Sequence, residues 1–125
     1  MPADHPLARN EVVTVDDLVG EPIFASAQGW EGNLASWAGE RRAELTLEGT
    51  FGLSYNASIF AREELGVLLT FDRLIDTSQQ SGLTFLPLSP RLESGLYLAW
   101  GRRQLLTPMS MMFLSQVKDE RRLSK

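Results

Sequence analysis

Residues 22–39 read PIFASAQGWEGNLASWAG, a strand pattern followed directly by a helix pattern. The apolar run at the start is typical of a short buried strand, and the small, polar residues after it turn the chain into a helix. In that helix Trp30, Leu34 and Trp37 are spaced so that they share one face, and Gly39 is placed to end it. A strand that leads straight into an amphipathic helix is the repeating unit of α/β folds.

Strand and helix patterns continue to alternate on both sides of this segment. Upstream, Thr14 and Asp17 have the spacing of a capping box and predict a short helix that Gly20 stops. Downstream, residues 43–47 alternate between apolar and polar side chains, which is the pattern of a half-buried strand. The sequence therefore predicts a helix, a strand, a second helix and a second strand in that order.

A third helix and a third strand follow. Ser54 is placed to cap a helix that runs through Leu65 and ends at Gly66. Residues 67–71 (VLLTF) are β-prone, as expected of a strand covered on both faces. Helices that alternate with strands are typical of a parallel sheet with right-handed crossovers. We therefore expect the α/β class, with a mainly parallel sheet flanked by helices.

The C-terminal third contains two more strand patterns and one helix pattern. Residues 83–86 (LTFL) predict a strand, and residues 96–100 (LYLAW) are so apolar that they predict a strand in the middle of a sheet. Thr107 and Pro108 predict a helix start, as an N-cap followed by a proline in the first turn. This helix has one apolar face and precedes a charged tail that begins at residue 118. The residues of the face are Met109, Met112, Phe113 and Val117.

Composition limits the classes of protein to which the chain can belong. With 125 residues and 43% apolar side chains, it suits one compact domain. It has no cysteine, which excludes disulfides, and no apolar run approaches the roughly 20 residues that cross a bilayer. We expect a cytoplasmic protein with no membrane association. A net charge of −4 opposes attraction to nucleic acid, so we expect no direct DNA binding by this chain.

No pattern of catalytic residues stands out. The single histidine, His5, precedes a proline and has no nucleophile-elbow serine to act on, and no phosphate-binding glycine loop is present. The acidic pairs Asp16/Asp17 and Glu63/Glu64 belong to helix segments, where neighbouring side chains diverge by about 100°, so we expect solvated faces rather than acid–base pairs. We predict no enzyme activity, no metal site and no cofactor.

The polar residues that follow the first two predicted strands form the candidate binding site. In a parallel sheet the carboxyl ends of the strands meet at one edge, where ligands bind in open α/β folds. Helix N-termini at that edge carry N–H groups and a positive dipole end, which suit a carboxylate. The candidate residues are Ser26, Gln28, Ser54, Tyr55 and Asn56. An equally weighted alternative is that Ser26 and Ser54 only cap their helices.

Short motifs occur in a fixed order along nearly the whole chain. They are DHPLA at residues 4–8, DLVGEPI at 17–23, YNAS at 55–58, ELGVLL at 64–69, FLPL at 85–88 and LAW at 98–100. In this order they resemble the C-terminal part of the effector-sensing domain of LysR-type transcriptional regulators. Each motif is short, and the resemblance lies in their succession.

The resemblance implies a non-catalytic sensor with a type 2 periplasmic-binding-protein-like fold, in which a small effector lies in the cleft between two lobes. Residues 1–94 would be the second regulatory lobe, and residues 95–125 would be the return strand and C-terminal helix of the first lobe. In the family, a winged helix-turn-helix, a linker helix and the earlier part of the first lobe precede this region. The resemblance therefore implies a fragment, a truncated gene product or a sequence that begins at an internal Met1.

A lobe without its partner would leave apolar surface uncovered. Residues 96–100 and the helix face within residues 109–117 would pack against the missing part of the first lobe. We therefore expect a homo-oligomer in which two chains cover each other, for example by exchanging the C-terminal strand and helix. Two functions stay open. One is an effector-sensing fragment, with a carboxylate as the candidate effector, and the other is a truncated remnant that acts only as an interaction or dimerisation module.

Overall fold

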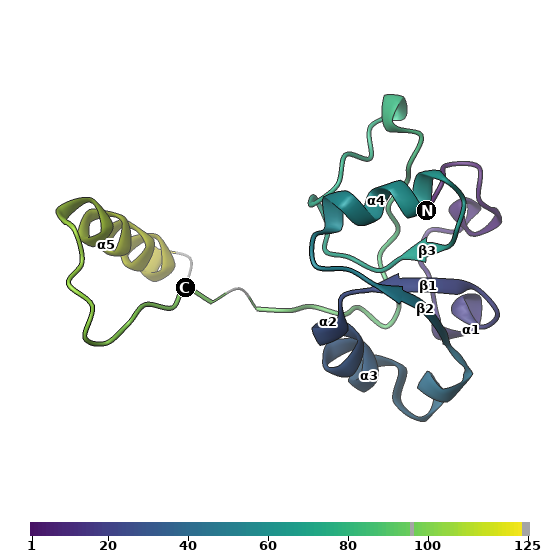
Figure 1. The fold of residues 1–125 in the computed structure, drawn as a ribbon, viewed down its shortest axis with the longest axis horizontal. Coiled ribbons are helices and arrows are strands. Elements are labelled where there is room, and N and C mark those ends of the chain that lie inside the picture. Colours follow the sequence, from purple (N-terminus) through teal and green to yellow (C-terminus); the bar gives the residue numbers. More distant parts are fainter. Residues whose placement is uncertain (96, 124–125) are drawn as a thin grey trace. The chain divides into compact units, whose positions relative to one another are not determined.

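The computed structural model describes residues 1–95 and 97–123, and the chain divides into two compact units, Met1–Ser94 and Gly95–Lys125. The division falls between the same two residues as the predicted one. The assignment of the units to two different lobes stays a prediction. The first unit holds the sheet, and the second holds one long helix (Figure 1).

The elements of the first unit follow the predicted alternation of helix and strand. In chain order they are η1 (a 3-10 helix, Pro6–Arg9), α1 (Val15–Leu18), β1 (Pro22–Ala25), α2 (Ala27–Glu31), α3 (Asn33–Ala38), η2 (Gly39–Glu44), β2 (Thr46–Thr50), α4 (Ser54–Arg62), β3 (Val67–Leu68) and η3 (Gln79–Ser81). The second unit contains α5 (Pro108–Leu123).

The three strands form a parallel sheet in the order β2-β1-β3, so the predicted α/β class with a parallel sheet is confirmed. The connection from β1 to β2 moves to one side of the central strand, and the connection from β2 to β3 moves back across it. Two right-handed crossovers in opposite directions place their helices on opposite faces of the sheet. Figure 1 accordingly shows α4 and the α2–α3 pair on opposite sides of the sheet.

The central strand β1 packs on both of its faces. Phe24 stacks on Phe60 of α4, with ring centroids 5.0 Å apart. Ile23 and Ala25 point to the opposite face, because side chains alternate along a strand. There they belong to the main core cluster, whose members are Val13, Leu18, Ile23, Ala25, Trp30 and Val67. Full burial of a side chain such as Ile23 contributes about 1.5–3 kcal/mol, so this cluster holds the first unit together.

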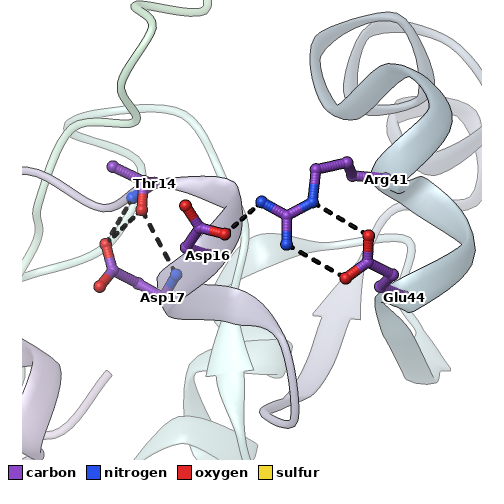
Figure 2. Close-up of polar contacts among 5 residues, drawn as sticks. All are labelled: Thr14, Asp16, Asp17, Arg41 and Glu44. Atoms are coloured by element: carbon purple, nitrogen blue, oxygen red, sulfur yellow. Dashed lines mark hydrogen bonds and ion pairs between the residues drawn. The ribbon is translucent and has the colours of Figure 1, made fainter.

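Polar contacts stabilise α1 and connect it to η2 at the amino-terminal edge of the sheet (Figure 2). α1 begins with the predicted capping box: the N–H of Asp17 donates to Thr14 Oγ1 at 3.3 Å, and the N–H of Thr14 donates to Asp17 Oδ2 at 2.8 Å. Arg41 of η2 donates to both carboxylate oxygens of Glu44, at 3.0 and 3.1 Å, and also to Asp16 of α1. Because α1 precedes β1 and η2 precedes β2, these contacts lie away from the candidate binding edge.

The single helix predicted around Trp30 is in fact two helices. α2 ends at Glu31 and α3 starts at Asn33, because Gly32 between them leaves the helical conformation, with φ −101° and ψ −100°. Gly39 ends α3 as predicted, at a φ of 57° that favours glycine. The spacing of the apolar residues alone does not reveal the break.

The second strand begins later than predicted. The predicted strand at residues 43–47 is wrong at its start, because η2 continues to Glu44 and β2 spans Thr46–Thr50. Alternation of apolar and polar side chains continues through both segments, so it does not mark where pairing begins. Pairing with β1 decides the start, since Pro22 is the first residue of β1 and lies opposite Thr46.

The end of α4 and the length of β3 also differ from the prediction. α4 ends at Arg62, before the predicted position, and β3 is only Val67–Leu68. Gly66 has a packing role instead of the predicted capping role. A Cβ at this position would collide with the carbonyl oxygen of Pro22, so glycine is needed for β3 to approach β1.

Two strands predicted in the C-terminal third do not form. Leu83 makes an isolated antiparallel bridge to Pro2, and residues 84–86 belong to no ladder. Residues 97–100 are not a strand either, and Leu96 lies outside the described residues. A strand exists only where a neighbouring strand binds its N–H and C=O groups, and an apolar run does not supply that neighbour.

The C-terminal helix α5 starts where the sequence predicts. The N–H of Ser110 donates to Oγ1 of Thr107 at 3.2 Å, which is an N-cap contact ahead of Pro108. The helix then continues to Leu123, through residues predicted to be a charged tail. Lysine, glutamate and arginine are good helix formers, so the charged residues extend the helix.

Candidate functional site

The carboxyl ends of the three strands lie level at one edge of the sheet. Ala25, the last residue of β1, is opposite Thr50, the last residue of β2, and Leu68 of β3 is opposite Phe24. The segments that leave the sheet continue the hydrogen bonding. The N–H of Leu69 donates to the carbonyl of Phe24 at 2.8 Å. The edge predicted to hold the candidate residues is therefore formed.

Ser26 and Gln28 follow the central strand at this edge. The N–H of Gly29 donates to Oγ of Ser26 at 3.1 Å, so the Ser26 hydroxyl caps α2, as the capping alternative predicts. Ser26 is half-buried, and Gln28 is exposed in the first turn of α2. A hydroxyl that accepts one hydrogen bond still has its own proton. Ser26 can therefore cap α2 and donate a hydrogen bond to a ligand at the same time.

Ser54 has a role different from the predicted cap. The N-cap residue of α4 is Leu53, without a side-chain cap, and Ser54 is the first residue of the helix. The Ser54 hydroxyl instead forms a 2.8 Å hydrogen bond with the hydroxyl of Thr70, which follows β3. This bond ties the first turn of α4 to the end of an edge strand. The sequence does not single out Thr70, because it lies within a β-prone run.

Tyr55 and Asn56 stand in the first turn of α4, and both are exposed. Tyr55 leaves 71% of its surface open to solvent. The backbone N–H groups of a first helical turn have no partner within the helix, and they point away from it. Together with Ser54, these two residues therefore present an amide, a phenol and backbone donors on the carboxyl side of the sheet.

A small hollow adjoins Thr70. It has a volume of about 30 Å³, and its wall includes Leu68, Leu83, Phe85, Thr84 and Arg73 besides Thr70. Pockets that enclose a drug-sized ligand measure about 300–1,000 Å³. The hollow is therefore too small for a whole effector of that size and suits a group of only a few atoms.

Several titratable side chains of the first unit make local structural contacts. His5 lies before α1, where its Nδ1 accepts the N–H of Leu7 at 3.2 Å and its Nε2 is 3.5 Å from Glu21. Hydrogen bonds from Thr14 lower the pKa of Asp17, and those from Arg41 lower the pKa of Glu44. Within residues 1–95 and 97–123, no three histidine, aspartate or glutamate side chains are grouped so that they could hold a metal ion.

Residues 1–122 match the family model of the LysR substrate binding domain. The chain belongs to this family. The resemblance seen in the short motifs is thereby confirmed, and the fold is of the type 2 periplasmic-binding-protein-like kind. LysR substrate binding domains are regulatory rather than catalytic, and they bind small-molecule effectors.

Two other comparisons bear on the chain. No curated protein and no solved structure matches it.

No helix within the described part of this LysR-family chain is both long and apolar enough to span a bilayer. The predicted cytoplasmic location and the predicted oligomer are not tested by these findings and stay predictions.

Proposed function

We propose that this chain is an effector-sensing part of a LysR-family transcriptional regulator, and that its small-molecule effector binds at the carboxyl edge of the sheet. The observation that carries the proposal is the family match over residues 1–122. In this assignment Met1–Ser94 is the second regulatory lobe, and Gly95–Lys125 supplies the return segment and last helix of the first lobe. The proposed effector-binding residues are Ser26, Gln28, Ser54, Tyr55 and Asn56.

The chemistry of this edge supports a carboxylate as the effector class. The first turn of α4 presents backbone N–H donors and the positive end of the helix dipole. Ser54 lies in that turn, and its hydroxyl is held in place by Thr70 at 2.8 Å. Asn56 adds an exposed amide that donates hydrogen bonds. A carboxylate accepts several such bonds at once, which makes it a better match than a neutral alcohol.

A thermal-shift screen of small aliphatic and aromatic carboxylic acids tests the proposal. A ligand at 100 times its Kd adds about 2.7 kcal/mol to the free energy of unfolding, which is a readily measured rise in Tm. For any acid that raises the Tm, Asn56→Ala is expected to reduce the rise in Tm, because the variant lacks the amide that donates to the carboxylate. The Asn56 side chain is exposed, so the variant is expected to keep the fold. Asn10→Ala, another exposed asparagine in the first unit, is the matched control.

Two outcomes would contradict this assignment. One is a panel in which no acid raises the Tm. The other is a ligand whose effect is reduced equally by Asn56→Ala and by Asn10→Ala, since an effector at the carboxyl edge contacts only the first of these.

A second candidate function, an interaction or dimerisation module without an effector, is favoured by the apolar surface of residues 97–123. Tyr97 is 92% exposed, Leu105 97%, Met109 80% and Met112 73%. Apolar patches of this kind on a folded protein mark places where another surface binds. In this candidate two chains cover each other through residues 96–100 and 109–117.

Sedimentation analysis over a range of protein concentrations tests this second candidate. Association that weakens in Met109→Glu and Met112→Glu variants is the expected result, because a charge in an apolar interface is costly to desolvate. A wild-type chain that stays monomeric at every concentration contradicts the oligomer and leaves the effector proposal intact.

A further inference from the structure

The wall of the small hollow beside Thr70 combines apolar and polar residues. Leu68 of β3, Leu83 and Phe85 are among its apolar residues, and Thr70, Thr84 and Arg73 are among its polar ones. An apolar wall with a few convergent polar groups is the usual composition of a small-molecule site. None of these six residues belongs to the binding set that the sequence predicts.

The volume of the hollow limits what it can hold. About 10–15 Å³ is needed for one water molecule, so a volume of about 30 Å³ accepts roughly two or three water-sized groups. The three heavy atoms of a carboxylate group are of this size, and further carbons of a ligand lie at the opening of the hollow. Larger rings and long chains are excluded unless most of the ligand lies outside the hollow.

Arg73 supplies the charge at the rim of the hollow. Its side chain is 92% exposed, and its Nε lies 3.7 Å from Asp72 Oδ2. An exposed pair of this kind holds the arginine weakly. The guanidinium has five N–H donors, and its terminal N–H groups match a carboxylate in a planar, two-pronged contact. Arg73 also has a left-handed φ of 65°, which is uncommon for a residue with a side chain.

The acidic residues near Arg73 do not reverse the preference of the hollow for an anion. Asp76 accepts the N–H of Ser78 at 2.9 Å, and this bond lowers the pKa of Asp76, with a smaller effect from Arg62. Two carboxylates, Asp72 and Asp76, are thus balanced by Arg62 and Arg73. With the carboxylates balanced, selectivity depends on which charged groups reach the hollow. Its wall includes Arg73 and Met1, and the N-terminal ammonium of Met1 donates to the carbonyl oxygen of Thr84 at 3.4 Å, so both charges in the wall are positive.

Thr70 connects the hollow to the proposed effector edge. Its hydroxyl forms the 2.8 Å hydrogen bond with Ser54, and the same residue lines the hollow. Two hydroxyls that share one hydrogen bond keep one further proton to donate and several lone pairs. A ligand oxygen in the hollow can therefore take a hydrogen bond from this pair.

We propose that the hollow is a subsite for the carboxylate of a short aliphatic acid, bound by Arg73 and by the Thr70 hydroxyl, with its carbons against Leu83 and Phe85. This inference deepens the proposed function and rests on it, because Thr70 is joined to Ser54. It adds an anion contact at residues 70–73, next to the donors that the first turn of α4 presents.

An NMR titration of the full, 15N-labelled chain with sodium propionate tests the subsite. Propionamide and propylammonium chloride serve as the neutral and cationic probes of the same size, at constant ionic strength. We expect the amide signals of Thr70, Arg73 and Thr84 to shift with propionate and to shift much less with the other two probes. Thr70→Val is expected to weaken propionate binding, and Thr70→Ser to restore it.

Arginine variants decide whether the charge is responsible. Arg73→Gln is expected to weaken propionate binding about fivefold, the size of one exposed charge pair. Arg91→Gln is the matched control, because Arg91 is also exposed and also pairs with a nearby acid, Glu93. The inference is overturned if propionate shifts no amide near the hollow, if propylammonium binds better, or if both arginine variants weaken binding equally.

The two proposals fail in different ways. An acid from the thermal-shift panel that binds and depends on Asn56 but not on Arg73 supports the proposed function and overturns the subsite. Propionate that binds in an Arg73-dependent way supports the subsite even if Asn56→Ala has no effect.

Discussion

The two units of this chain differ in how much of their apolar surface is buried. Every fully buried residue of the described chain lies in the first unit, around β1 and the helices on both of its faces. In the second unit α5 has no buried residue. Trp100 there contacts Lys118, whose Nζ lies 5.6 Å from the ring centroid, and this cation–π contact is exposed. The first unit has a core, and the second has a helix without one.

This difference separates helix formation from helix stability. The cap at Thr107 and the helix-forming residues after it are local signals, and they specify where α5 starts. Most of the stability of a helix in a protein comes from packing its apolar face. A unit of roughly thirty residues is below the size at which a chain normally folds alone. The second unit therefore needs a covering surface to be stable, whereas the first has a core of its own.

Separating the two units should have the largest effect on folding. We expect a chain cut after Ser94 to keep a cooperative unfolding transition, and a peptide of residues 95–125 to be largely unfolded, because it has no core of its own. Far-UV circular dichroism of both pieces, with urea as denaturant, measures this. A fully helical peptide with a cooperative melt would remove the distinction between the units.

Truncating one apolar side chain in each unit should show the next largest effect. Ile23 is fully buried in the central strand, so Ile23→Ala should lower the free energy of unfolding by about 2–5 kcal/mol. Leu105 is 97% exposed, so Leu105→Ala should change it by no more than about 0.5 kcal/mol. Urea denaturation of both variants is the measurement. A large loss in the Leu105 variant would indicate that the second unit is packed after all.

Removing a helix cap in each unit is a finer test. Thr14→Ala breaks the capping box of α1 and should destabilise the first unit by about 1 kcal/mol. Thr107→Ala should lower the helix content of α5 and leave the urea midpoint of the first unit unchanged. Circular dichroism measures the helix content, and urea denaturation followed by tryptophan fluorescence measures the midpoint of unfolding. Equal shifts of the midpoint would mean that the two units unfold together.

The smallest expected effect is the response to acid. Hydrogen bonds lower the pKa of Asp17 and the pKa of Glu44 in the folded chain. Because both folded pKa values lie below the ordinary ones, the stabilisation is present above about pH 4.5 and is lost as the pH falls through the folded values. The Tm of the wild type should therefore fall more between pH 5 and pH 2 than that of an Asp17→Asn, Glu44→Gln variant. Parallel curves for the two proteins would contradict this.

The sequence predicts the fold class well and the limits of its elements less well. The capping box at Thr14, the strand at residues 22–25 and the start at Pro108 are confirmed because each depends on residues close together in the chain. The start of β2 and the length of β3 depend on pairing with β1, which alternation of side chains does not encode. The predicted strand at residues 83–86 fails for the same reason.

For the binding edge, sequence by itself determines which residues follow the strands, because parallel strands bring their carboxyl ends to one edge. It therefore locates Ser26, Ser54 and their neighbours correctly, without testing whether they bind an effector. Only the tertiary structure decides what each side chain contacts there. The bond between Ser54 and Thr70 and the hollow lined by Arg73 join residues that are far apart in the chain. The physical reason is that local signals select helix, strand and cap, whereas contacts between distant segments arise only once the core around β1 has formed.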